Sequence, residues 1–331
     1  MSVPTLSIGV PAYNQGAFLR ETLESILNQD VPFDEIVVSN NHSTDSTAQV
    51  IAEIQAEYPG RVLAVTPATH LRMGANWNFT ISHMRSQWIS LLSSDDLVMP
   101  HFVSNIREAL SLSDNAALVH GAWRDIAQDG TPLGDHHLLS MPAVLRPPDT
   151  LYRQRFGPKG SFAAFALRRD IWQRVGGFPE EELILGGDWA MWLLAGALGD
   201  IVYTDKVISA YRTGHQPDVH RARHHIHMRE LFTAYKTMLP RATQLGGFGI
   251  PDWIARASRQ RFRQALIQTS REYTLEERPK LIESFRPWSE AVGEQELFQQ
   301  FERGEVLRRA PMDILRPIAR QWFAKVRRER S

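Results

Sequence analysis

The 331-residue chain has the composition of an ordinary folded protein, with 43% hydrophobic and 22% charged residues. Its formal net charge is zero, so the chain as a whole offers no electrostatic basis for binding nucleic acid. The absence of cysteine excludes disulfides and thiolate chemistry. No apolar run approaches the ~20 residues that a membrane-spanning helix needs, and the N-terminal residues do not resemble a signal peptide. We therefore expect a cytoplasmic protein.

The first hundred residues alternate between short apolar runs and amphipathic segments. Apolar clusters predict strands, and apolar residues at helical spacing predict helices. The predicted strands are Leu6–Val10, Glu35–Ser39, Arg61–Val65 and Trp88–Leu92, and the predicted helices are Phe18–Leu27, Thr47–Tyr58 and Ala75–Met84. This alternation indicates a Rossmann-like α/β fold with a mostly parallel central sheet flanked by helices.

The middle of the chain continues the α/β pattern and the end abandons it. Further strands are predicted at Ala116–His120, Ser161–Leu167, Ile201–Tyr203 and Val207–Tyr211, and further helices at Phe102–Leu112, Arg169–Val175 and Trp189–Ala197. Residues 132–160 are rich in Pro, Gly and His and are expected to form a loop able to cover a site. From residue 225 helix formers dominate. We therefore predict an α/β domain over 1–218 and a helical C-terminal region over 219–331.

Two adjacent carboxylates, Asp95 and Asp96, follow the predicted strand that starts at Trp88. A parallel strand delivers them to the carboxyl edge of the sheet, where ligands bind in open α/β folds. A divalent metal with oxygen ligands, Mg²⁺ or Mn²⁺, would offset their repulsion and link them to substrate phosphates. The alternative is a solvated turn after a strand.

Seven short motifs occur together in one order over about residues 4–217. They are Ser7-Ile-Gly-Val-Pro-Ala-Tyr-Asn14, Glu35-Ile-Val-Val-Ser-Asn-Asn-His-Ser-Thr-Asp-Ser-Thr47, Gly74-Ala-Asn-Trp-Asn78, Leu91-Leu-Ser-Ser-Asp-Asp96, Val175-Gly-Gly-Phe178, Asp188-Trp-Ala-Met-Trp192 and Tyr211-Arg-Thr-Gly-His215. In this order the chain resembles the family 2 inverting glycosyltransferases, which have the GT-A fold. The resemblance implies a nucleotide-sugar half over about 1–100 and an acceptor half over about 101–218.

The resemblance also implies roles for four residues. Asp188 matches the family's catalytic aspartate, which removes the proton from the acceptor hydroxyl. Asp96 matches a ligand of Mn²⁺ or Mg²⁺, and Asp95 lies nearer the ribose and donor sugar. His215 matches a position that often completes the metal or diphosphate site. The alternatives are an N-cap role for Asp188 and a solvated loop position for His215.

The nucleotide of the donor is expected over the ends of the first two strands. Pro11, Ala12 and Tyr13 would line one side of the base, with Tyr13 available for stacking, and Arg72 could reach a phosphate or the base. Asn14, Asn40 and Asn76 are also expected to bind the nucleotide sugar. Asn78 is expected to be structural and to tie its loop to the first strand. Arg72 could instead be an exposed loop residue. The histidines His42, His120, His136 and His137 lack zinc-site spacing and are expected in loops or at the surface.

Three positions depart from the family pattern. Ser93 replaces the first acid of the usual Asp-x-Asp-Asp, and Gly187 replaces a common Glu before the catalytic Asp. Asn40 replaces an Asp that pairs with uracil, and an amide has donors and an acceptor for more than one base. The donor could therefore be a UDP, dTDP or GDP sugar.

The expected reaction is metal-dependent transfer of a sugar to a glycan or lipid-linked acceptor in surface polysaccharide, O-antigen or lipid-linked glycan synthesis. Two other functions stay open. One is a nucleotidyltransferase acting on sugar phosphates, although the loop Pro11–Gly16 has one glycine and no basic residue. The other is a non-catalytic subunit that binds nucleotide sugars.

Residues 308–331 carry eight basic and two acidic residues, a net charge of +6, with apolar residues at helical spacing. A basic amphipathic helix can lie on an anionic membrane, which would place the enzyme at the inner face of the cell membrane. The alternative is a helix docked on its own domain or on another subunit of a homo-oligomer.

Overall fold

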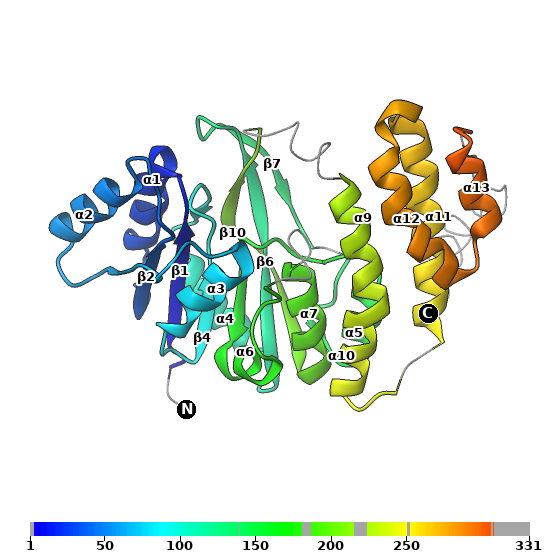
Figure 1. Ribbon diagram of the computed structural model, residues 1–331. Coiled ribbons are helices and arrows are strands. Elements are labelled where there is room, and N and C mark those ends of the chain that lie inside the picture. The colour runs from blue at the N-terminus through cyan, green and yellow to red at the C-terminus, as the bar shows by residue number, and fades with distance from the viewer. Residues whose placement is uncertain are drawn as a thin grey trace. The chain divides into compact units, whose positions relative to one another are not determined.

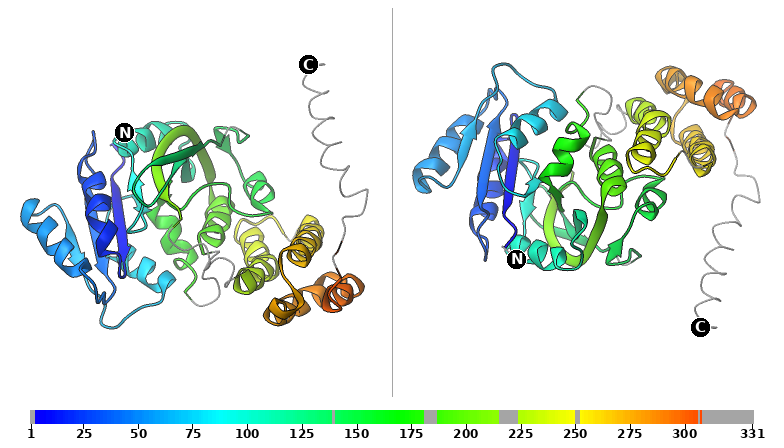
Figure 2. Two further views of the ribbon diagram at one scale, coloured as in Figure 1. Left: turned by 90° about the horizontal axis from the view of Figure 1, so that it is seen from above. Right: turned by 90° about the horizontal axis from the view of Figure 1, so that it is seen from below.

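The computed structural model describes residues 3–138, 140–180, 187–214, 224–249, 252–305 and 307. Contacts between Cα atoms divide the chain into two compact units. Figures 1 and 2 show the chain coloured by residue number from the N-terminus to the C-terminus. The first unit comprises 1–223 and 233–254, and the second comprises 224–232 and 255–331. The predicted boundary after residue 218 lies outside the described residues and remains a prediction.

The first unit is built on a sheet of ten strands among the described residues. Their bounds are β1 Leu6–Ala12, β2 Glu35–Asn40, β3 Leu63–Val65, β4 Trp88–Leu91, β5 Leu97–Val98, β6 Ala116–Ile126, β7 Pro132–His136, β8 Val144–Leu145, β9 Phe165–Arg168 and β10 Asp200–Arg212. The order is β3-β2-β1-β4-β9-β6-β10-β5, with β7 beside β6 and β8 beside β10. Strands β3, β2, β1 and β4 are parallel, as are β6 and β10, whereas β9 is antiparallel to β4 and β6. The mostly parallel sheet confirms the predicted fold class.

Helices cover both faces of this sheet. In the first unit they are α1 Gly16–Leu27, α2 Thr47–Glu57, α3 Met73–Ser82, α4 Phe102–Leu110, α5 Asp149–Gln154, α6 Arg169–Val175, α7 Gly187–Leu198, η1 Ala234–Met238 and α10 Leu239–Leu245. Leu6, Ile8 and Val10 of β1 point into an apolar core shared with α1, α2 and α4. Figures 1 and 2 show α2 and α3 on opposite sides of β1 and β2. The core therefore fixes the edge on which β1 and β2 end.

Two sequence predictions in this unit were wrong. The strands expected at 201–203 and 207–211 form one strand, β10, whose register with β6 shifts between Tyr203 and Val207. The exposed polar residues Asp205 and Lys206 fall at this irregularity, and they broke the apolar pattern in the sequence. Residues 132–160 contain β7, β8 and α5 rather than a continuous loop, because buried Leu151 and Gln154 anchor α5 against the rest of the unit.

The second unit is helical, as predicted for the C-terminal region. Its helices are drawn from α9 His224–Thr233, α11 Trp253–Glu272, η2 Leu275–Glu277, α12 Pro279–Val292 and α13 Gln295–Glu302. Phe262 and Phe285 pack edge to face at 5.8 Å in its core. The buried Arg278 donates hydrogen bonds to the carbonyls of Ser270 and Phe301. None of the helices in the described ranges combines the length and apolar composition needed to cross a bilayer. The basic segment 308–331 lies outside the described residues.

Candidate functional site

The Asp95–Asp96 pair lies in the turn between β4 and β5. Asp96 is 1% exposed, and its Oδ1 accepts the backbone N–H of Arg212 at 2.8 Å. Its Oδ2 is buried and has no hydrogen-bond partner within the described ranges. Burial, followed by the charge of Asp95, raises the pKa of Asp96 well above its usual range. A cation at this carboxylate would relieve both effects, so the residue fits a metal ligand.

Arg212 holds the aspartate turn in place. Its guanidinium, 1% exposed, donates from Nε to the carbonyl of Asp95 at 2.8 Å and from Nη1 to the carbonyl of Gln128 at 2.6 Å. Its Nη2 donates to Glu21 of α1 at 2.7 Å. One side chain at the end of β10 therefore joins the aspartate turn, the β6–β7 turn and α1. The guanidinium also lies 5.0 Å from the ring of Phe18.

Asp188 lies in the first turn of α7. Its Oδ1 accepts the N–H of Trp189 at 2.6 Å, and the Trp189 indole N–H donates to the carbonyl of Gln154 at 2.9 Å. The carboxyl group is half-buried. Asp188 lies inside α7 and bonds the N–H of the next residue, whereas an N-cap side chain accepts from the N–H two or three residues further on, so this contact does not match the capping alternative.

Tyr211 connects these acidic residues, which lie far apart in the chain. Its pKa is raised by burial and then by the charges of Asp96, Asp95, Asp125 and Asp188. All four carboxylates therefore raise the pKa of the same side chain, that of Tyr211, which is 41% exposed. In the register of β10 with β6, Tyr211 lies opposite Asp125. The aspartate turn, the start of α7 and the end of β6 thus border one partly open acidic region.

The loops after β1 and β2 are locked to each other at the sheet edge. Asn14 adopts a left-handed conformation with φ 51°, and its Oδ1 accepts the N–H of Thr44 at 2.8 Å. Asn40 accepts the N–H of Ser43 at 3.0 Å, and Ser43 Oγ accepts the N–H of Asn14 at 3.1 Å. Ala12 is buried beside Asn40, and Pro11 is partly buried. The predicted nucleotide residues of these two loops are therefore brought together.

The ring of Tyr13 is exposed at this edge. It is 48% exposed and packs at 4.5 Å against His70. The loop of His70 is held by Asn41, whose side-chain amide exchanges two hydrogen bonds of 2.8 Å with the backbone of Leu71. Arg72, which follows, is exposed at the start of α3. An aromatic face and a cation thus border the same edge.

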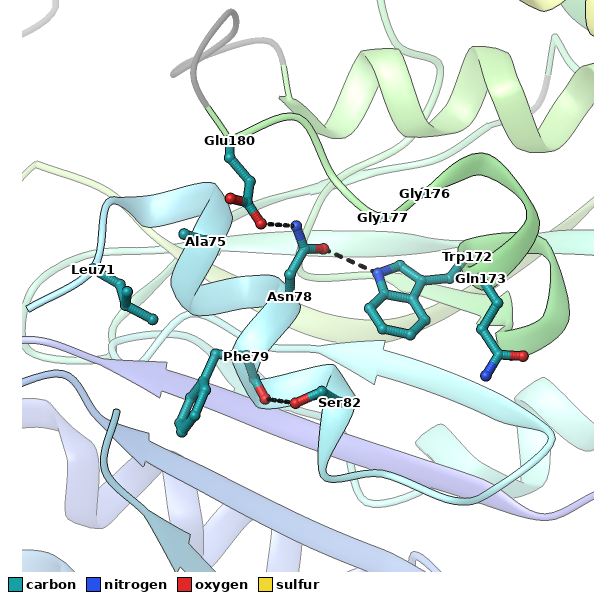
Figure 3. Close-up of a pocket in the computed structure, with 10 residues that line it drawn as sticks. All are labelled: Leu71, Ala75, Asn78, Phe79, Ser82, Trp172, Gln173, Gly176, Gly177 and Glu180. Atoms are coloured by element: carbon teal, nitrogen blue, oxygen red, sulfur yellow. Dashed lines mark hydrogen bonds between the residues drawn. The ribbon is translucent and has the colours of Figure 1, made fainter. Parts of the chain in front are cut away.

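The two asparagines of α3 have separate contacts. Asn76 is 4% exposed, and its Oδ1 accepts a hydrogen bond of 2.7 Å from the Ser39 hydroxyl. This contact is buried between α3 and β2. Asn78 is structural, but the expectation that it binds the first strand was wrong. Its amide bonds Phe178 and Glu180, beyond α6, and the Trp172 indole. Asn78 lines a pocket of about 610 Å³ between α3 and α6. Figure 3 shows the residues that line this pocket.

The histidines give a mixed outcome. His215 lies outside the described residues, so its predicted metal role is untested. His120 is buried against Trp192 and Tyr203, which corrects the expectation of a loop or surface position. Within the part of the chain that the structure describes, no group of three or more His, Cys, Asp or Glu side chains could hold a metal ion.

Four residues of the site were given no role by sequence reasoning: Glu21, Asp125, Tyr211 and Arg212. The signal available for two of them was the Tyr211-Arg212 pair at the end of an apolar strand. Glu21 and Asp125 become recognisable only through their partners, because they lie 191 and 86 residues from Arg212 and Tyr211 in sequence.

Comparison with known proteins identifies the family. Residues 7–176, about half of the chain, match the family model described as Glycosyl transferase family 2. The chain is 25% identical over 205 residues to the hyaluronan synthase of Pasteurella multocida, covering 62% of this chain and 20% of that protein. It is 31% identical over 99 residues to the putative glycosyltransferase EpsE of Bacillus subtilis, covering 30% of this chain and 36% of that protein. The chain therefore spans much less than two thirds of either relative.

Solved structures share the architecture at low sequence identity. S. aureus TarS 1–349 in complex with UDP-GlcNAc matches with a TM-score of 0.67 and 17% identity, over 91% of this chain and 88% of that chain. The mannosyltransferase PcManGT from Pyrobaculum calidifontis, in complex with GDP-Man and Mn²⁺, matches with a TM-score of 0.54 and 16% identity, over 90% and 86% of the two chains. With the family match over half of its length and this shared architecture, the chain belongs to glycosyl transferase family 2 and has the GT-A fold.

Proposed function

We propose that the protein is a metal-dependent inverting glycosyltransferase that moves a sugar from a nucleoside diphosphate sugar to a hydroxyl acceptor. The observation that carries the proposal is the buried Oδ2 of Asp96, which has no hydrogen-bond partner within the described residues and lies next to Asp95; the charges of Asp95, Asp96 and Asp188 all raise the pKa of Tyr211, which supports placing Asp188 in the same region. Glycosyl transfer needs acidic groups for two separate tasks. One task is to hold a cation at the leaving diphosphate, and the other is to accept the proton of the acceptor.

Asp96 is our candidate ligand for Mn²⁺ or Mg²⁺, with His215 as a second ligand. The buried, unpartnered Oδ2 of Asp96 supports this role, because a buried anionic oxygen is unfavourable without a counter-charge. The bound ion would supply Lewis-acid stabilisation of the charge that develops on the diphosphate. Asp95, half-buried next to Asp96, would face the ribose and the donor sugar. Arg212 would keep both carboxylates at the sheet edge through its contact with the Asp95 carbonyl.

Asp188 is our candidate base. Its carboxylate would take the proton of the acceptor hydroxyl while that oxygen bonds to the anomeric carbon and the bond from this carbon to the diphosphate oxygen breaks. Attack from the face opposite the diphosphate inverts the anomeric centre. The place of Asp188 in the first turn of α7, where it is only partly buried, supports this role, because a general base must come within hydrogen-bond reach of the acceptor hydroxyl.

The nucleotide is proposed to lie at the edge formed by the loops after β1 and β2. Pro11, Ala12 and Asn14 would border the base with Tyr13, and Asn40 and Arg72 would lie on the other side, with Asn76 supporting this edge from within the fold through Ser39. TarS was solved with UDP-GlcNAc and PcManGT with GDP-Man, so proteins of similar fold bind nucleotides with either uracil or guanine. A UDP, dTDP or GDP sugar is therefore the proposed donor class.

The deciding experiment compares the parent with Asp188→Asn. Calorimetry with UDP, dTDP and GDP, each with and without Mn²⁺, identifies the nucleobase that the protein prefers and tests whether binding needs the metal. Sugar nucleotides that carry this nucleobase then serve as donors in a product-release assay. We expect Asp188→Asn to bind nucleotide as the parent does and to lose at least ~100-fold in turnover. Normal turnover by Asp188→Asn would refute the base assignment, and pyrophosphate formation from a sugar phosphate and a nucleoside triphosphate would instead establish a nucleotidyltransferase.

The acceptor is proposed to be a growing surface glycan or a lipid-linked sugar. The basic, amphipathic sequence of 308–331 supports peripheral attachment at the inner face of the cell membrane. Co-sedimentation of the full chain with phosphatidylglycerol vesicles should decrease steeply with salt, and phosphatidylcholine vesicles should bind little. Equal binding to both lipids, or none, would favour a helix docked on protein.

A further inference from the structure

The chain on both sides of residues 181–186 packs against one turn of α3. Before this stretch, Asn78 bonds Phe178 twice: its Oδ1 accepts the Phe178 N–H at 2.8 Å and its Nδ2 donates to the Phe178 carbonyl at 2.9 Å. The same amide accepts from the Trp172 indole at 3.0 Å and donates to Glu180 at 2.9 Å (Figure 3). All the hydrogen-bonding groups of one side chain are thus directed at α6 and at the residues that follow it.

After this stretch, the neighbouring residue Trp77 packs against Gly187. A Cβ placed on Gly187 would lie 3.3 Å from Cζ3 of the Trp77 indole, so this ring lies against the backbone immediately before Asp188. The same indole contacts Phe178 edge to face at 5.3 Å and stacks on Phe162 at 4.5 Å. Trp77 therefore touches both flanks, and its own position is fixed by a third aromatic ring.

Beside the pocket that Asn78 lines, α3 and the first flank approach each other closely at two glycines. A Cβ on Gly177 would lie 2.6 Å from Oδ1 of Asn78, and a Cβ on Gly74 would lie 2.2 Å from the carbonyl oxygen of Pro179. Gly177 also has a positive φ of 85°, which other residues rarely adopt. Both glycines thus let the helix and the chain approach more closely than any side chain would allow.

We propose that Trp77 and Asn78 are positioning residues that hold the two flanks 178–180 and 187 and thereby fix Asp188 at the sheet edge. This inference rests on the proposed function of Asp188 as the base. A rigid attachment on both sides matters because a displacement of about 1 Å in a reacting group can cost ~100-fold in rate. Asn76 of the same helix bonds Ser39 of β2. Helix α3 therefore contacts both the chain next to Asp188 and the strand that leads to the proposed nucleotide site.

The test uses Asn78→Asp, which keeps the shape of the side chain and replaces its two N–H donors with a carboxylate. That carboxylate would face the carbonyl of Phe178 and the carboxylate of Glu180. Trp77→Leu is the second variant, and Ser82→Ala, at the exposed end of α3, is the matched control. Hydrogen–deuterium exchange of the full chain reports the flanks directly, without reference to any reaction. We expect faster exchange at 176–180 and 187–192 in both variants and unchanged exchange in Ser82→Ala.

Kinetics then separates positioning from a general structural role. We expect kcat to fall by between about 10- and 100-fold in both variants, while the KM for the donor and calorimetric affinity for its nucleoside diphosphate stay within about twofold. Adding Glu180→Gln to Asn78→Asp should restore part of kcat, because the Gln amide can donate to the new carboxylate. Loosened flanks with unchanged kcat would overturn the proposal, as would unchanged exchange or a parallel loss of nucleotide affinity. If Asp188→Asn itself turned over normally, the proposed function would fail while the exchange result would still stand.

Discussion

Arg212 is the side chain whose replacement the structure allows us to treat most quantitatively. In Arg212→Met the aliphatic stem stays and the guanidinium is lost. The carbonyls of Asp95 and Gln128 then lose short hydrogen bonds of 2.8 and 2.6 Å from a group that is 1% exposed. A hydrogen bond from a charged donor contributes about 1.5–3 kcal/mol, and we count only the bond to the Asp95 carbonyl, because Gln128 is exposed and water can replace its lost donor. We also leave out the pair with Glu21 because that carboxylate is 53% exposed.

The bond to the Asp95 carbonyl alone predicts that Arg212→Met lowers the free energy of unfolding of the first unit by about 1.5–3 kcal/mol. Arg212→Lys keeps the charge and can reach only part of these acceptors, so it should lose less. Guanidinium denaturation gives the loss in free energy, and hydrogen exchange of the peptides around Asp95 and Gln128 localises it. A loss below about 0.5 kcal/mol for Arg212→Met would refute the view that this side chain joins the turns.

Two further predictions concern single side chains. Burial lowers the pKa of His120 to about 4, below its ordinary value of 6.5, so the neutral ring contributes stability that is complete above pH 6.5 and is lost as the pH falls toward 4. Between pH 7.5 and 5.5 the parent should therefore lose about 1.4 kcal/mol more than His120→Phe, measured by urea denaturation, and equal losses would contradict a buried neutral ring. At the nucleotide edge, Tyr13→Ala should weaken binding of the preferred nucleoside diphosphate by about tenfold through lost stacking. Tyr152→Ala, which removes another exposed tyrosine, should leave the calorimetric affinity unchanged, and equal affinities for both variants would argue against stacking by Tyr13.

The sequence alone determined the alternating strands and helices of the first ninety residues and the family. Apolar runs such as that of β4 and helical spacing in α1 are local patterns, and they predict local structure because each element must bury one face. The Asp95–Asp96 pair was found in the same way, since a strand that ends in carboxylates places them at an edge of the sheet.

Only the tertiary structure decided which side chains meet there. Glu21 and Arg212 form an ion pair although they are 191 residues apart in sequence. The charges of four separate aspartates, together with burial, raise the pKa of Tyr211. The hydrophobic periodicity of the sequence does not predict such contacts between distant side chains, because strand order and register determine them when the chain folds. The same reason explains Asn78 and His120: the first turned out to hold the chain beyond α6 and the second to be buried, since burial and hydrogen-bond partners depend on which elements pack together.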